Sequence, residues 1–192
     1  MKNLKTAILL FIFLTAITGV IYPVIVTVIG QLAFSQQAAG SLVRAEDGTV
    51  LGSALIGQEF SGPRYFWPRP SATADFPYNS MASGGSNLGP TNPELLKKVA
   101  NRVKSLHEAG MEGMAPSDLA LSSGSGLDPH ISLEAAVFQV ARVARARGMS
   151  VAQVRQLVED HLEDRQLGFL GMPRLNVLQM NLALDRASSH AR

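Results

Sequence analysis

The longest apolar run in the chain extends from Ala7 to about Leu32 and contains no charged residue. As a helix rising about 1.5 Å per residue it is about 39 Å long, which exceeds a bilayer core of about 30 Å. Lys2 and Lys5 precede the run, and the next charge is Arg44. Because positive charge favours the cytoplasmic side, the pattern predicts one transmembrane helix with the rest of the chain outside.

Signal-peptide cleavage is the alternative to an uncleaved anchor. Ala33–Ser35 and Ala38–Gly40 offer small residues at which cleavage could occur. Hydrophobic regions of signal peptides are about 7–15 residues long, so this run favours an uncleaved anchor in the cell (inner) membrane. The chain has no cysteine, which excludes lipoprotein processing. The predicted organisation is a cytoplasmic N-terminus (residues 1–6), a transmembrane helix (7–32), a bridge (33–41) and an extracytoplasmic domain (42–192).

Pro23 lies near the middle of the apolar run, between Gly19 and Gly30. A helix in lipid tolerates proline where neighbouring groups satisfy the freed carbonyl, and small residues allow helices to pack closely. The segment therefore predicts contact with a partner helix or, alternatively, a functional kink.

Beyond the bridge the pattern changes to short strands and turns. Asp47 and Gly48 separate Leu42–Val43 from Thr49–Leu51, which predicts a hairpin. Residues 61–93 are rich in Gly, Pro, Ser and Asn but also contain Tyr65, Phe66, Trp67, Phe76 and Tyr78. Because disordered segments are poor in aromatic residues, we expect a long ordered loop that packs on the domain or docks on a partner.

Three capped amphipathic helices are expected next. The start signals are Asn92 with Pro93, Ser132, and the capping box of Ser150 with Gln153, and the stop signals are Gly110 and Gly148. The apolar stripes are Leu96, Val99, Val103 and Leu106; Leu133, Ala136, Val137, Val140 and Ala144; and Val151, Val154, Leu157 and Val158. Residues 118–123 are predicted as a strand, and residues 177–185 as a helix or strand. Strands early and helices late indicate an α+β, or loosely α/β, domain.

Charge adds little to this picture. The 17 basic residues include Lys2 and Lys5, so the remainder balances the 15 acidic residues, and no basic stripe indicates nucleic-acid binding. A basic cluster comprises Arg142, Arg145 and Arg147, and an acidic cluster comprises Glu159, Asp160, Glu163 and Asp164. We expect solvated faces or pairing between the clusters, with partner docking as the alternative.

The segment Gly84–Thr91 imitates a phosphate loop. Gly84 and Gly89 have the G-x-x-x-x-G spacing, but Pro90 stands where a Walker loop needs lysine. A glycine-rich turn before the next helix is favoured over a phosphate site, and nucleotide hydrolysis by this route is not expected.

The segment Gly124–His130 brings Ser125, Asp128 and His130 together in sequence. The G-x-S-x-G pattern is absent because Ser123 precedes Ser125 by two, and members of a catalytic triad are normally distant in sequence. We interpret the segment as a turn leading into a helix. No metal site is predicted, because the four histidines, His107, His130, His161 and His190, lie on different predicted elements.

Five blocks of sequence occur in a familiar order. They are Gly52–Phe60, Tyr65–Phe66 with Arg69–Ala72, Ser83–Pro93, Ser123–Ser132, and Gly168–Gly171 with Pro173–Leu178. Together they resemble the C subunit of the bacterial Kdp potassium-transporting P-type ATPase over nearly the whole chain. Leu133 and Met172 stand where the family usually has Pro and Glu, and Met172 leaves the charge pairing of Arg174 open.

The resemblance implies a non-catalytic subunit of an ATP-driven, high-affinity potassium uptake complex. Its implied partners are a channel-like potassium-translocating subunit, a P-type ATP-hydrolysing subunit and a small stabilising peptide. The family is described as a catalytic chaperone that raises the ATP affinity of the hydrolysing subunit, so ATP is expected in the complex and no cofactor on this chain alone. The implied nucleotide or partner contacts are Ser83, Gly84, Gly85, Ser86, Asn87, Gly89, Ser125, Gly126, Asp128 and His130.

The predicted topology opposes direct contact with ATP, which is cytoplasmic. We therefore expect roles in assembly and in shaping the outer potassium entrance, with the anchor as a docking element. Two other classes remain open: an anchored extracytoplasmic hydrolase that uses Ser125 or His130, and a tethered binding or sensor domain that works without transport partners.

Overall fold

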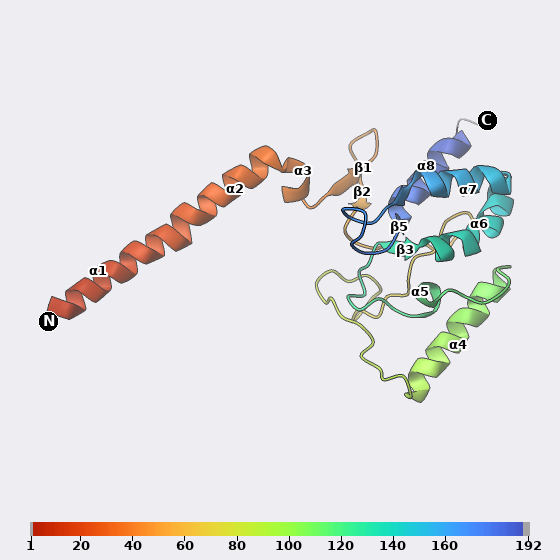
Figure 1. Ribbon diagram of the computed structural model, residues 1–192, viewed down its shortest axis with the longest axis horizontal. Coiled ribbons are helices and arrows are strands. Elements are labelled where there is room, and N and C mark those ends of the chain that lie inside the picture. Colours follow the sequence, from red (N-terminus) through yellow and green to blue (C-terminus); the bar gives the residue numbers. More distant parts are fainter. Residues whose placement is uncertain (1, 190–192) are drawn as a thin grey trace. The chain divides into compact units, whose positions relative to one another are not determined.

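The computed structural model describes residues 2–189, and His190 lies outside this range. The chain divides between Leu51 and Gly52 into two compact units (Figure 1). The first unit contains α1 (Lys2–Ala16), a π-helical turn (Ile17–Ile21), α2 (Tyr22–Ala33), α3 (Ser35–Ala38) and β1 (Leu42–Arg44). Strand β2 (Val50–Ser53) contains the division.

Residues Asn3–Ala33 form one helical segment that is long and apolar enough to cross a membrane. The π-helical turn ends at Ile21, two residues before Pro23. The Tyr22 N–H donates to the Ile17 carbonyl, five residues back. Proline has no N–H and cannot donate the next helical hydrogen bond. The π-helical turn accommodates this interruption, so the helix continues through Pro23. The prediction of one N-terminal helix that is long and apolar enough to span a membrane is confirmed.

Strands β1 and β2 form the predicted hairpin. The Ala45 N–H donates to the Thr49 carbonyl at 2.9 Å, and the Gly48 N–H donates to the Ala45 carbonyl at 3.0 Å. The Asp47 carboxylate accepts the Thr49 N–H at 2.9 Å, so side-chain and backbone groups close the turn together.

The second unit mixes helices with an antiparallel sheet. Its elements are α4 (Pro93–Glu108), α5 (Ser117–Ala120), β3 (His130–Ser132), α6 (Leu133–Arg147), α7 (Val151–Asp160), β4 (Leu162–Glu163), β5 (Arg174–Asn176) and α8 (Val177–Ser189). The strand order is β3-β5-β4, and Leu175 lies opposite both Ile131 and Leu162. The expected mixture of helix and sheet is confirmed, although this sheet is formed by strands that alternate with the late helices.

The predicted helix starts are confirmed in detail. The Asn92 side chain accepts the Glu94 N–H at 2.8 Å, and the Ser132 hydroxyl accepts the Ala135 N–H at 3.0 Å. Ser150 and Gln153 form the reciprocal capping box. Each cap satisfies a backbone donor that the first helical turn leaves free.

The core lies between the sheet and helices α6, α7 and α8. Its fully buried members include Ile131, Val140, Val143, Val154, Val158, Leu175, Met180 and Leu184. The predicted stripes are wrong at some positions: Leu96 is 59% exposed, and Val137 and Val151 are also exposed. Helix α4 fully buries only Leu106 of its apolar stripe, while Val99 and Val103 are half-buried.

Residues 118–123 do not form the predicted strand. Ser117–Ala120 is the short helix α5, and the Asp118 carboxylate accepts the Ser132 N–H at 2.7 Å. This bond holds α5 at the start of α6. Leu119 of α5 is buried there and does not pair with a neighbouring strand. The ambiguous segment 177–185 is helical and belongs to α8.

Candidate functional site

The two glycine-rich segments lie against each other in the folded chain. The Gly84 N–H and the Ser83 hydroxyl both donate to the Ser125 carbonyl, at 2.8 and 3.1 Å. Gly126 has φ +69°, and a Cβ at this position would lie 2.6 Å from Thr73 Cγ2 and 2.7 Å from the Gly84 carbonyl oxygen. Only glycine fits there, so at least this glycine serves close packing between the loops.

The rest of the first glycine-rich segment leads toward α4. Gly85 and Ser86 line a cavity of about 580 Å³ between the loops and that helix. Asn87 adopts a left-handed conformation with φ +52°, and the Gly89 carbonyl accepts the Asn92 N–H at 3.0 Å. The segment thus forms the turn into α4 that the sequence favours.

Asp128 and His130 belong to a charged cluster at the start of β3. The Asp128 carboxylate accepts a hydrogen bond from Arg69 at 2.9 Å and another from the His130 N–H at 3.0 Å. Burial alone would raise the pKa of Asp128, but the hydrogen bonds from His130 and the charge of Arg69 outweigh it and hold this pKa below its usual value. The imidazole of His130 lies 3.5 Å from Asp128 and 3.8 Å from Glu163.

These groups do not assemble a catalytic triad in the described chain. The Ser125 hydroxyl accepts the Leu127 N–H at 3.1 Å, which is a turn interaction, and among residues 2–189 it has no hydrogen bond to His130. Within the same residues no three His, Asp or Glu side chains are grouped as metal ligands. The geometry therefore favours a structural role for this segment.

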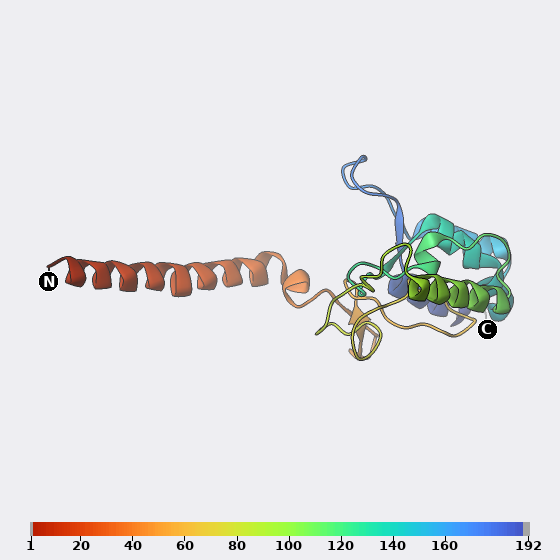
Figure 2. The same cartoon turned by 90° about the horizontal axis from the view of Figure 1, so that it is seen from below.

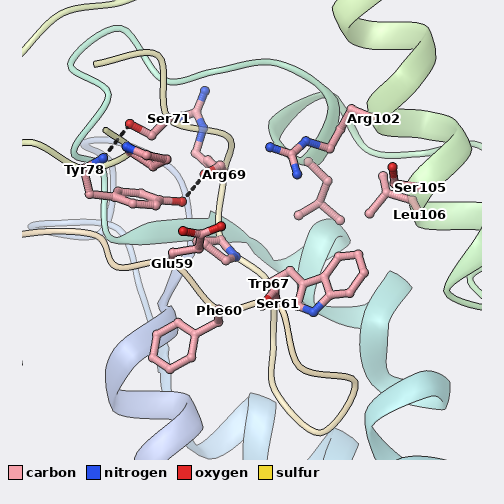
Figure 3. A pocket seen from close by; sticks show the side chains of 13 residues that line it. Glu59, Phe60, Ser61, Trp67, Arg69, Ser71, Tyr78, Arg102, Ser105 and Leu106 are labelled. Atoms are coloured by element: carbon pink, nitrogen blue, oxygen red, sulfur yellow. Dashed lines mark hydrogen bonds between the residues drawn. The ribbon is translucent and has the colours of Figure 1, made fainter. Parts of the chain in front are cut away.

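A second cavity, of about 220 Å³, lies beside the first (Figure 3). Glu59, Trp67 and Arg69 approach it from the loops, while Arg102 projects into it from α4. The Tyr78 hydroxyl donates to the Arg69 carbonyl at 2.6 Å, and burial raises the pKa of Tyr78. Both cavities are lined by Ser71, Arg102 and Ser105, so they adjoin along one face of α4. Sequence reasoning did not select Arg102, which belongs to no recognisable motif, and it used Glu59 only as a member of the Gly52–Phe60 block.

The aromatic loop, residues 62–67, is held by side chains that the sequence interpretation missed. Arg142 donates to the Pro63 and Tyr65 carbonyls at 2.7 and 2.9 Å, and its guanidinium lies 4.5 Å from the centre of the Trp67 ring. Burial lowers the pKa of Arg142 to about 10, which still leaves it charged at neutral pH. The loop therefore packs on its own domain, as one of the two predictions for residues 61–93 required.

Two neutral side chains complete this attachment. Asn181 on α8 binds both the N–H and the carbonyl of Phe66, at 2.8 and 3.0 Å. Gln139 on α6 does the same for Trp67, at 2.7 and 3.1 Å. The spacing of Gln139 and Arg142 among buried small residues of α6 is a signal that could have identified them.

Of the two expectations for the basic and acidic clusters, mutual pairing is wrong, whereas Arg145, Glu159, Asp160 and Asp164 are exposed, as solvated faces require. Arg142 is only 5% exposed because the aromatic loop covers it. Arg147 pairs with Asp185 at 2.8 Å, and Glu163 pairs with Arg174 at 2.8 Å. Met172 therefore does not leave Arg174 without a carboxylate partner.

These features define a protein that has, among residues 2–189, one candidate membrane span and a mixed helix–sheet domain. A family model described as the c chain of the K+-transporting ATPase, KdpC, matches residues 4–186. The chain is 60% identical to a potassium-transporting ATPase KdpC subunit of Citrifermentans bemidjiense, covering 96% of this chain and 97% of the relative. It is 58% identical to that of Geotalea uraniireducens (98% and 100% covered) and 57% identical to that of Methylococcus capsulatus (96% and 97%).

The chain belongs to the KdpC family, whose members are subunits of the potassium-transporting ATPase. The resemblance seen in the sequence is thereby confirmed, together with the expectation of a potassium-transporting ATPase subunit that has one candidate transmembrane helix. A subunit of this kind has other subunits as partners.

Proposed function

We propose that this chain is a non-catalytic accessory subunit of an ATP-driven, high-affinity potassium uptake complex. The family match over residues 4–186 carries the proposal. Its partners are a channel-like potassium-translocating subunit, a P-type ATP-hydrolysing subunit and a small stabilising peptide.

The proposed topology places residues 1–6 in the cytoplasm, residues 7–32 in the membrane, residues 33–41 as a bridge and residues 42–192 outside the cell membrane. The charge distribution supports it, because Lys2 and Lys5 precede the span and Arg44 is the next charged residue.

The proposed role is assembly of the complex and shaping of the outer potassium entrance. Direct nucleotide contact is disfavoured on two grounds. ATP is cytoplasmic, and the Gly84 and Gly126 N–H groups, which a phosphate loop would offer to phosphate oxygens, donate to the Ser125 and Ser123 carbonyls. An effect on ATP affinity would then act through the partner subunits.

Thiol labelling tests the topology, because the chain has no cysteine of its own. In right-side-out vesicles carrying the complex, Met81→Cys should react with a membrane-impermeant reagent, since Met81 is 94% exposed. Asn3→Cys should react only after the vesicles are opened. The reverse pattern would place the domain in the cytoplasm and remove the objection to nucleotide contact.

Replacing the anchor tests its role in assembly. Deleting residues 7–32 should abolish co-purification with the P-type subunit. A polyleucine helix of equal length restores membrane attachment, and continued loss of co-purification would show that the anchor's own residues dock the chain. Full assembly without any anchor would refute the assembly role.

The hydrolase alternative has a separate test. Complexes with Ser125→Ala or His130→Ala should keep the substrate affinity and maximal rate of ATP-driven potassium uptake. Hydrolysis of an added soluble ester or peptide by the parent complex, lost in both variants, would favour the hydrolase instead.

A further inference from the structure

The connection between β4 and β5 forms an apolar protrusion, which we call the 164–173 arm. Its exposed side chains are Leu167 (83%), Phe169 (69%), Leu170 (48%) and Met172 (76%). Residues 166–173 carry no charge. Figure 2 shows the arm as a blue loop that projects away from helices α6, α7 and α8. Such a concentration of large apolar side chains on the protein surface marks an interaction site.

The arm has a defined shape. Gln166 and Leu170 exchange two backbone hydrogen bonds, both 2.9 Å long. Leu167, Gly168 and Gly171 all have positive φ, at +54°, +81° and +79°. The left-handed conformation is costly for leucine, so the tip holds an apolar side chain at a strained position. At the base, Arg174 and Glu163 pair at 2.8 Å across the two strands. A preformed protrusion loses little conformational entropy when it binds.

We propose that the 164–173 arm inserts into an apolar socket on the extramembrane face of another subunit of the same ATPase. The proposal rests on the accessory role described above. The arm's chemistry favours a protein partner over the lipid surface: its apolar part contains no Trp, Tyr or Lys, and the nearest basic residues, Arg165 and Arg174, are accompanied by Asp164 and Glu163. Phenylalanine and methionine are among the residues enriched in protein–protein interfaces, where a few well-packed side chains fill pockets on the partner.

Site-specific photo-crosslinking in native membranes that contain the whole complex tests the arm. A photoreactive amino acid at Phe169 should form an adduct with another polypeptide of the ATPase. The matched control is the same probe at Met114, which is 93% exposed and lies outside the arm, and it should give no such adduct. A lipid adduct at position 169, no adduct there, or equal polypeptide adducts at both positions would overturn the proposal.

A substitution measures the energetic contribution. Leu167→Asn with Phe169→Ser removes two apolar anchors, and asparagine suits the left-handed position. Retention of this chain by the other subunits during detergent dilution should weaken at least about tenfold, because interface anchors contribute more than a factor of ten each. Met81→Ser with Met114→Ser should have no effect. Unchanged retention of the arm variant would overturn the proposal. If retention is unchanged but deletion of the anchor still abolishes assembly, the arm proposal fails and the accessory role stands.

Discussion

The aromatic loop 62–67 and the 164–173 arm are both irregular segments with large apolar side chains, yet the first is packed on the domain and the second is exposed. Phe66 is completely buried, whereas Phe169 is 69% exposed. The difference lies in the backbone partners. Side chains of α6 and α8 bind the carbonyl and N–H groups of the aromatic loop, whereas the backbone groups of residues 165–170 bond to one another within the arm. An apolar loop joins a core when neighbouring elements satisfy its polar backbone.

Among the substitutions that test this comparison, Arg142→Ala should lower the free energy of unfolding most. It leaves the Pro63 and Tyr65 carbonyls without their donor and removes the cation–π contact with Trp67, so we expect a loss of roughly 3 kcal/mol in unfolding free energy. Urea unfolding of the full chain in detergent, followed by Trp67 fluorescence, measures it. Arg145→Ala, on the exposed face of the same helix, should change stability by less than about 0.5 kcal/mol. Equal effects of the two variants would contradict the assigned role of Arg142.

Asn181→Leu should have the next largest effect. The substitution keeps the size of the side chain but breaks both hydrogen bonds to the Phe66 backbone in a buried site, which should cost about 2 kcal/mol. The same unfolding assay applies. Asn101→Leu, on the exposed surface of α4, is the control. An Asn181→Leu variant as stable as the parent would mean that the aromatic loop is held by apolar packing alone.

Asp128→Asn should change the pH dependence of stability. Because the pKa of Asp128 is lowered in the folded state, its stabilising contribution is present above the unfolded pKa of about 3.9 and is lost as pH falls through the folded pKa. The parent should therefore exceed the variant in stability at pH 6, and the difference should shrink on acidification below about pH 4. Unfolding measured across pH, with Glu112→Gln as an exposed control, detects this. A difference that grows toward low pH would reverse the assigned sign.

Leu167→Asn with Phe169→Ser should have the smallest effect on stability, within about 0.5 kcal/mol, because both side chains are exposed. The unfolding midpoint of the full chain measures it. This near-neutral result beside a large change in Arg142→Ala would sharpen the contrast between the two segments. A loss of 2 kcal/mol or more would show that the arm packs within the chain, contrary to its exposure.

Local features of the fold were predictable from the sequence, and long-range ones were not. The starts of α4, α6 and α7 depend on caps within three residues, so Asn92, Ser132 and Ser150 were sufficient. Arg142 was misinterpreted because its partner Pro63 lies 79 residues away. The short helix α5 was mistaken for a strand because its position depends on the bond from Ser132 to Asp118, which sequence spacing does not reveal.

The candidate site followed the same division. The turn character of Gly84–Gly89 and Ser125 could be read from residue types, since glycine and proline have strong local preferences. Their approach to each other could not, because it depends on contacts between loops more than forty residues apart, of which the Ser83–Ser125 bond is one. The cavities beside α4 were missed for a similar reason: Glu59 and Arg102 meet only in the fold.

The central strand β5 has mechanical consequences. It carries the arm at its N-terminal end, and α8 begins at Val177, directly after the strand ends at Asn176. Only residues 170–173 separate Phe169 from β5, and no residue separates β5 from α8, the helix that holds the aromatic loop through Asn181. A pull on the tip would therefore reach β5 through residues 170–173 and load its pairing with β3 and β4 along the strand. Force applied to the arm is therefore transmitted through β5 to the domain core, in which Leu175 is buried.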